Sequence, residues 1–237
     1  MSIWTRIAEA LSALANGEAL SVVLDRLRNA PAPERSIAFT IAVIALGAKM
    51  AKADGAVTRD EVSVFRRIFA IAPEDESSAA RVFNLARQDV AGFDSYARKV
   101  AALFRKEDGA LCADDRNVLI DLLEGLFAIA MADGAYHPQE DAFLEQVATI
   151  FGLDARCYNV VRARFVEGAP RDPYEVLGIS PDATLAKARA AWKQAVRDSH
   201  PDVMIARGVP AEAVKLAERR LIAINEAWDA ISARRAA

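Results

Sequence analysis

Residues able to do chemistry gather in two places along the chain. The first is a repeated turn, Ala53-Asp54-Gly55-Ala56 and Ala132-Asp133-Gly134-Ala135, followed in each copy by a glutamate, Glu61 or Glu140. The second is His200-Pro201-Asp202, which directly follows a segment with basic residues spaced four apart. Acidic residues next to tight turns can cap the following helix or bind a hard divalent cation. A histidine in an exposed segment can form hydrogen bonds with a partner protein.

Catalytic constellations are hard to assemble from this sequence. The chain has 2 histidines and 2 cysteines, and it lacks the G-x-x-x-x-G-K-[ST], G-x-S-x-G and H-E-x-x-H motifs. Cys112 and Cys157 form neither a CxxC metal pair nor a disulfide framework, which indicates a reducing compartment. We therefore expect a protein that is not an enzyme.

Helical periodicity dominates, and no segment alternates in the manner of a strand. The expected helices of the central region cover 34–53, 59–71, 78–90, 94–105, 115–132, 138–151 and 155–166. Two prolines and a glycine within 168–173 predict a linker. We expect an all-α protein divided into an N-terminal amphipathic helical segment (1–33), a helical domain (34–167), that linker (168–173) and a C-terminal domain (174–237).

The two Asp-Gly turns each follow an apolar helix and precede an amphipathic one, which predicts two helix–turn–helix units packed together. In the first copy, Thr58-Arg59-Asp60-Glu61 has the pattern of a capping box. The alternative is a divalent-cation site built from four carboxylates, those of Asp54, Glu61, Asp133 and Glu140. Taken alone, the physical argument favours capping.

This repeat resembles the TerB-like fold, first named from tellurite-resistance proteins, over roughly residues 34–166. The short Asp-Gly turns are its most specific part. In that family a paired acidic cluster is associated with metal binding, so the resemblance implies a metal role for the same four carboxylates alongside capping. His137 replaces the Thr58 of the first copy, so the two halves are not equivalent.

The C-terminal segment predicts an antiparallel pair of helices. Thr184 is a candidate N-cap for a helix over 185–199. A long helix follows Pro210, and its apolar residues alternate by three and four, at Val214, Ala217, Leu221, Ile224, Trp228 and Ile231. Such a stripe packs against a partner helix, which leaves His200-Pro201-Asp202 in an exposed loop between the two.

The first helix of this pair also carries charge. Arg189, Lys193 and Arg197 form a basic stripe along one face and lead toward His200. Residues 170–237 hold 11 basic and 9 acidic residues, whereas the whole chain has a net charge of −3. A mildly basic end on an acidic body gives no reason to expect a nucleic-acid partner.

The joint order of Tyr174-Glu175-Val176-Leu177-Gly178, a basic helix, His200-Pro201-Asp202 and Ile224-Asn225-Glu226-Ala227-Trp228 resembles the J domain of DnaJ-type co-chaperones, over roughly residues 171–237. The segment Val203–Pro210 resembles the DjlA-like branch in particular. Proteins of that branch combine a TerB-like region with a C-terminal J domain, in the order found here.

The J-domain resemblance implies docking on a DnaK-type chaperone and stimulation of its ATP hydrolysis. His200, Pro201 and Asp202 take the essential positions, and the basic stripe of Arg189, Lys193 and Arg197 would steer an acidic partner surface. Trp192 stands where tyrosine is usual. Gln194 and Val203 stand where basic residues are common, so we expect weaker affinity for the partner.

The resemblance also sets expectations for the rest of the molecule. It implies that the TerB-like domain recruits clients or senses a ligand, and that no cofactor is required beyond an optional divalent cation. The alternative function is a metal-binding stress-response module related to tellurite resistance. No apolar stretch reaches the roughly 18 residues of a membrane span, so we expect a cytoplasmic protein, at most peripheral to the inner membrane. The client and self-association stay open.

Overall fold

The computed structural model describes residues 32–53, 92–104, 113–131, 134–166, 168, 172–210 and 215–236. Their helices are α3 (Ala32–Ala53), α6 (Phe93–Leu103), α7 (Ala113–Ala130), α8 (Pro138–Phe151), α9 (Ala155–Phe165), α10 (Pro173–Val176), α11 (Leu185–Asp198), α12 (Pro201–Ala206) and α13 (Lys215–Ala236). These ranges contain no strand, which confirms the all-α prediction. None of these helices is both long and apolar enough to cross a membrane.

Several predictions from the sequence lie outside the described residues. They are the N-terminal segment up to residue 31, the helices expected over 59–71 and 78–90, and Cys112, Asp54, Glu61 and Asp133. Within the described ranges, the helices predicted over 34–53, 94–105, 115–132, 138–151 and 155–166 agree with α3, α6, α7, α8 and α9 to within two residues at each end.

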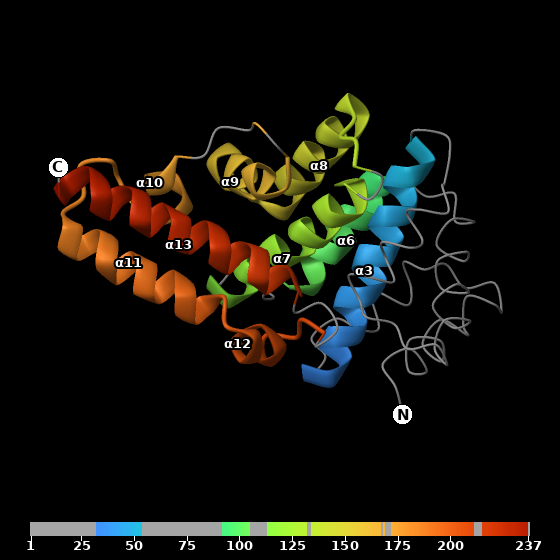
Figure 1. Ribbon diagram of the computed structural model, residues 1–237. Helices are drawn as coiled ribbons and strands as arrows, with labels where there is room; N and C mark the ends of the chain where they lie inside the picture. Colours follow the sequence, from blue (N-terminus) through green and yellow to red (C-terminus); the bar gives the residue numbers. More distant parts are fainter. Residues whose placement is uncertain are drawn as a thin grey trace.

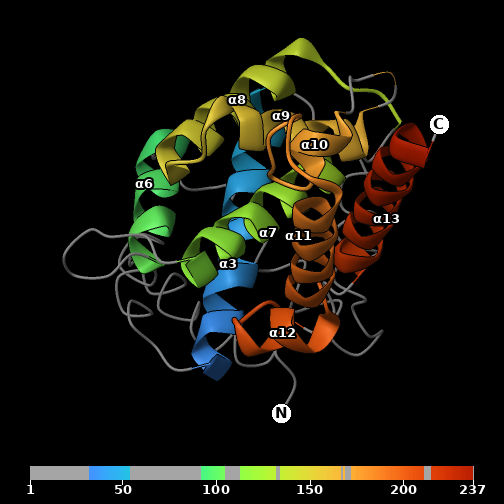
Figure 2. The same ribbon diagram turned by 90° about the vertical axis from the view of Figure 1, so that its left-hand side faces the viewer.

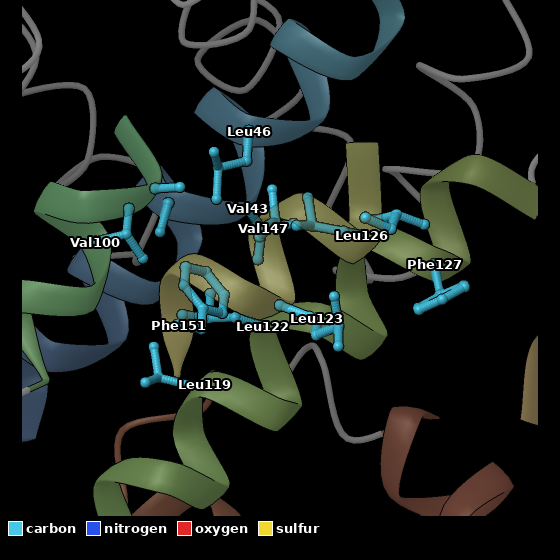
Figure 3. Close-up of a cluster of buried hydrophobic side chains, with 14 of the residues drawn as sticks. Val43, Leu46, Val100, Leu119, Leu122, Leu123, Leu126, Phe127, Val147 and Phe151 are labelled. Carbon is cyan, nitrogen blue, oxygen red and sulfur yellow. The ribbon is translucent and has the colours of Figure 1, made fainter. Parts of the chain in front are cut away.

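Helices α3, α6, α7, α8 and α9 form a bundle, here called the body, with α7 at its centre (Figure 1). Every residue of α7 from Asp121 to Ala130 is buried, because neighbouring helices cover it on several sides. The close-up shows leucine, valine and phenylalanine side chains of four helices meeting in this core (Figure 3). Gly47 allows α3 to approach α7 closely, since a Cβ there would lie 2.9 Å from Cδ1 of Ile129.

From Gly134 onward, the residues of the second repeat have the local structure that their sequence predicts. Gly134 adopts a φ of 86°, in the left-handed region that glycine reaches without strain. Pro138 begins α8, where its missing N–H leaves no hydrogen bond unmade. The helix ends at Gly152, also left-handed with a φ of 77°.

Helices α11 and α13 run antiparallel along one side of the body, as predicted (Figures 1 and 2). They share a small core with the segment around α10, made of Leu177, Ile179, Ala183, Ala188, Ile224, Ala227 and Ile231. Thr184 caps α11 by accepting a hydrogen bond from the Lys187 N–H at 3.2 Å, which confirms its predicted position.

Helix α12 and the residues around it pack with the body rather than with this small core. Met204, Val209 and Ala217 are fully buried and belong to the same hydrophobic cluster as the core of α3 and α7. The expected boundary at 168–173 stays a prediction. Met204, Val209 and Ala217 all come after this expected boundary in the sequence, yet they complete the core of the body.

Candidate functional site

His200-Pro201-Asp202 lies at the start of α12 rather than in a loop as the sequence suggested. His200 is the N-cap residue, Pro201 is the first helical residue, and the Asp202 N–H donates to Nδ1 of His200 at 3.2 Å. Proline suits this position because the first helical N–H has no partner within a helix, and a side-chain acceptor satisfies a neighbouring N–H. The segment that would recognise a partner is therefore a rigid helix start.

Both ends of this segment face solvent. The side chain of His200 is 58% exposed and that of Asp202 is 87% exposed. Because Nδ1 accepts a hydrogen bond, a neutral His200 ring carries its proton on Nε2 and can donate there to a partner. The Asp202 carboxylate can accept hydrogen bonds from a partner's cationic side chain.

The basic stripe continues from this segment along α11. Arg189, Lys193 and Arg197 are all exposed, as the sequence predicts. Gln194, which stands where a basic residue is common, accepts a hydrogen bond from Nη2 of Arg197 at 2.6 Å and donates one to Asp198 at 2.8 Å. The substitution thus removes one positive charge while holding the last arginine of the stripe in place.

A pair of tryptophans, one on α11 and one on α13, packs these two helices together. The rings of Trp192 and Trp228 stack with centroids 5.3 Å apart and planes 18° apart, and Nε1 of Trp192 donates to Oδ1 of Asn225 at 2.9 Å. Tyrosine is usual at this position. In Trp192 the indole N–H takes the place of the tyrosine hydroxyl as the polar group of the ring. Arg189 and Lys193 border a shallow depression of about 600 Å³ beside this pair.

In the part of the chain that the structure describes, arginine hydrogen bonds join the C-terminal helices to the body at two places, in addition to the apolar contacts of Met204, Val209 and Ala217. At the first, Arg156 of α9 donates from Nη2 to the Ile179 carbonyl at 2.9 Å, and its Nε lies 3.7 Å from Glu175 of α10. At the second, Arg220 of α13 reaches into the body. Its Nε and Nη2 donate to Glu124 at 3.1 and 2.7 Å, and its Nη2 also bonds Asp121.

The second connection is a buried ion cluster, defined by Asp121, Glu124, Arg164 and Arg220. Arg164 of α9 bonds Glu124 from the other side, and each of these four side chains is at most 9% exposed. Burial raises the pKa of Asp121 despite the nearby Arg220. Burial also opposes ionisation of Glu124, but two arginines outweigh it and lower that pKa. Two carboxylates and two guanidinium groups balance the charge.

Sequence reasoning missed Arg156 and Arg220 as contacts between the two parts, and it missed Arg164 as a member of the buried ion cluster. A signal was present for Arg220, which falls three residues after Ala217 and four before Ile224, in the register of the buried stripe. Asp121 and Glu124 likewise interrupt the apolar run of α7. A charge at a core position indicates a buried partner elsewhere in the fold.

Of the four carboxylates next to the Asp-Gly turns, the structure describes that of Glu140. This carboxylate accepts a hydrogen bond from the His137 N–H at 2.9 Å, as in a capping box, and Glu140 is buried. The described residues contain no group of three or more potential ligands placed to hold a metal ion. The four-carboxylate cation site stays a prediction, since its other three residues lie outside the described ranges.

Comparison with known proteins defines the class of the body. The family model described as tellurite resistance protein TerB matches residues 40–163, which span most of the body. The chain belongs to this TerB family. The TerB-like fold that its Asp-Gly turns suggest is thus confirmed.

Curated relatives extend the similarity beyond this region. The chain is 29% identical to the co-chaperone protein DjlA of Photobacterium profundum, over 84% of the chain and 78% of the relative. It is 27% identical to DjlA of Aliivibrio fischeri over 84% and 79%, and 25% identical to DjlA of Coxiella burnetii over 86% and 80%. The predicted resemblance to the DjlA-like branch is confirmed. No solved structure matches the chain.

Proposed function

We propose that this protein is a J-domain co-chaperone that docks on a DnaK-type chaperone and stimulates its ATP hydrolysis. In this role His200, Pro201 and Asp202 contact the chaperone at the start of α12, and the basic stripe of α11 steers the two proteins together. The TerB-like body recruits a client or senses a ligand.

The observation that carries this proposal is the exposed start of α12. His200 and Asp202 present a hydrogen-bond donor and a carboxylate to solvent, at the end of a helix whose exposed face carries Arg189, Lys193 and Arg197. Such an arrangement recognises a surface that combines acidic patches with a cationic group. The relatives named DjlA co-chaperones support the same conclusion.

Asp202→Asn tests the proposal with little risk to folding, because the replaced carboxylate is 87% exposed. We expect the variant to lose at least nine-tenths of the stimulation of steady-state ATP hydrolysis by a DnaK-type chaperone, since an amide cannot form a charge-assisted bond to a partner cation. Asp229→Asn, an exposed aspartate on α13, is the matched control and should retain full stimulation. Equal stimulation by Asp202→Asn and wild type would contradict the assigned role.

A further inference from the structure

The segment that follows His200-Pro201-Asp202 carries a buried arginine that the proposed function does not use. Arg207 comes directly after α12 and is 6% exposed. Its Nη2 donates to the carbonyl oxygen of Asp198, the last residue of α11 and two residues before His200. One side chain therefore joins the end of α11 to the end of α12, across the residues proposed to meet the chaperone.

The backbone around Arg207 makes this connection stiff. The Arg207 N–H donates to the carbonyls of Val203 and Met204, each at 3.1 Å, and the Val209 N–H donates to Met204 at 3.0 Å. The carbonyl of His200 in turn accepts from the N–H groups of Val203 and Met204, each at 3.0 Å. Movement of Arg207 would thus be transmitted to His200 through a single turn of helix.

The body supplies the other half of the contact. Met204 and Val209, on either side of Arg207 in the sequence, are fully buried in the body's hydrophobic core. The apolar contacts of this segment are therefore made with the body. Figure 2 shows α12 at the end of α11, near one end of α3.

We propose that Arg207 is a positioning residue, buried where the residues around α12 pack against the body, and that it fixes His200-Pro201-Asp202 in the orientation that meets the chaperone. This inference rests on the proposed function and deepens it. The body then contributes to chaperone docking without touching the chaperone, because it determines where the start of α12 points.

Amide hydrogen exchange on the full chain tests the positioning directly and without a chaperone. Arg207→Met keeps a side chain of similar length but removes the donor to the Asp198 carbonyl. We expect this variant to speed exchange of the amides of Val203, Met204 and Val209 at least tenfold, while amides of α8 (Pro138–Phe151) keep wild-type rates. Arg234→Ala, an exposed arginine near the end of α13, is the control and should change neither set.

Two outcomes would overturn the positioning role. Unchanged exchange around α12 in Arg207→Met would show that other contacts hold the segment. A uniform rise that includes the amides of α8 would show a general loss of stability instead.

Stimulation of a DnaK-type ATPase then links position to function. We expect Arg207→Met to raise the concentration of chain needed for half-maximal stimulation about tenfold and to leave the maximal rate unchanged, because fewer molecules present His200 correctly at any moment. Raised α12 exchange together with an unchanged half-maximal concentration would overturn the functional part of this inference. If the wild type gives no stimulation, the proposed function fails, whereas the exchange result still decides whether Arg207 positions the segment.

Discussion

At the scale of single residues, the sequence departs from the usual J-domain pattern at Trp192, and the structure shows how the replacement works. The indole keeps an aromatic surface against Trp228 and uses its N–H to bond Asn225. Both interactions connect the basic helix to α13. The replacement therefore preserves the contact between α11 and α13.

Trp192→Phe and Trp192→Ala separate these two contributions. We expect Trp192→Phe to lower the free energy of unfolding by about 1 kcal/mol, since it loses one hydrogen bond but keeps a ring against Trp228. Trp192→Ala should cost about 3 kcal/mol, because it also removes the packed ring. Urea unfolding measures both, and Asn225→Ala, which removes the same hydrogen bond, should match Trp192→Phe. An equal loss in the two Trp192 variants would contradict the role of the stacked pair.

At the scale of elements, the junction of α8 and α9 is held by one carboxylate. Asp141 of α8 accepts hydrogen bonds from the hydroxyl groups of Tyr136 and Tyr158 and from Nε of Arg162, each at 2.8 Å. Partial burial opposes ionisation of Asp141, but these three donors outweigh it and hold its pKa below the usual 3.8. Ionised Asp141 therefore fastens α9 to the helix that follows the second Asp-Gly turn.

Asp141→Asn should weaken this junction in a pH-dependent way. A carboxyl whose pKa is lower in the folded state stabilises the fold above its unfolded pKa, and the effect fades as the pH falls through the folded pKa. We expect a loss of about 1 to 2 kcal/mol at pH 7, from charge-assisted hydrogen bonds that the amide cannot replace. The difference from wild type should shrink below about pH 4, as measured by urea unfolding at several pH values. A difference that stays constant down to pH 3 would contradict this explanation.

The elements show what the sequence could and could not predict. Periodicity and caps are local, so helices such as α8 and the cap at Thr184 followed from residues within a few positions. The start of α12 was missed because six residues are too few to show helical periodicity. Arg220 was missed because its contacts join segments far apart in the sequence, and no local pattern encodes which carboxylate a buried guanidinium meets. The exposed residues His200 and Asp202 could be predicted, because recognition motifs are contiguous.

At the scale of the whole molecule, a buried charge cluster unites the body with the C-terminal helices. Arg220 enters from α13 and bonds Asp121 and Glu124 of α7, and Arg164 of α9 completes the set. Residues after α11 also complete the core of the body. The C-terminal helices and the TerB-like body therefore form one packed unit in the described residues (Figure 1).

Arg220→Ala tests this unity. Removing the guanidinium leaves two buried carboxylates with less compensation, so we expect the free energy of unfolding to fall by about 3 to 5 kcal/mol. Arg234→Ala, on the exposed end of the same helix, should change it by less than about 0.5 kcal/mol. Scanning calorimetry of the wild type should give a single endotherm, because the two parts share core residues. Two separate endotherms, or an Arg220→Ala variant as stable as wild type, would contradict a single cooperative unit.

The measurement that tests the account most directly is single-turnover ATP hydrolysis by a DnaK-type chaperone loaded with ATP and then mixed with the full chain. Single turnover isolates hydrolysis from nucleotide exchange. We predict that the wild type accelerates hydrolysis at least tenfold, and that His200→Gln, whose folding should match wild type by circular dichroism, gives no acceleration. Equal acceleration by wild type and His200→Gln would contradict the assignment of the α12 start as the docking site. No acceleration by wild type would contradict the proposed co-chaperone function.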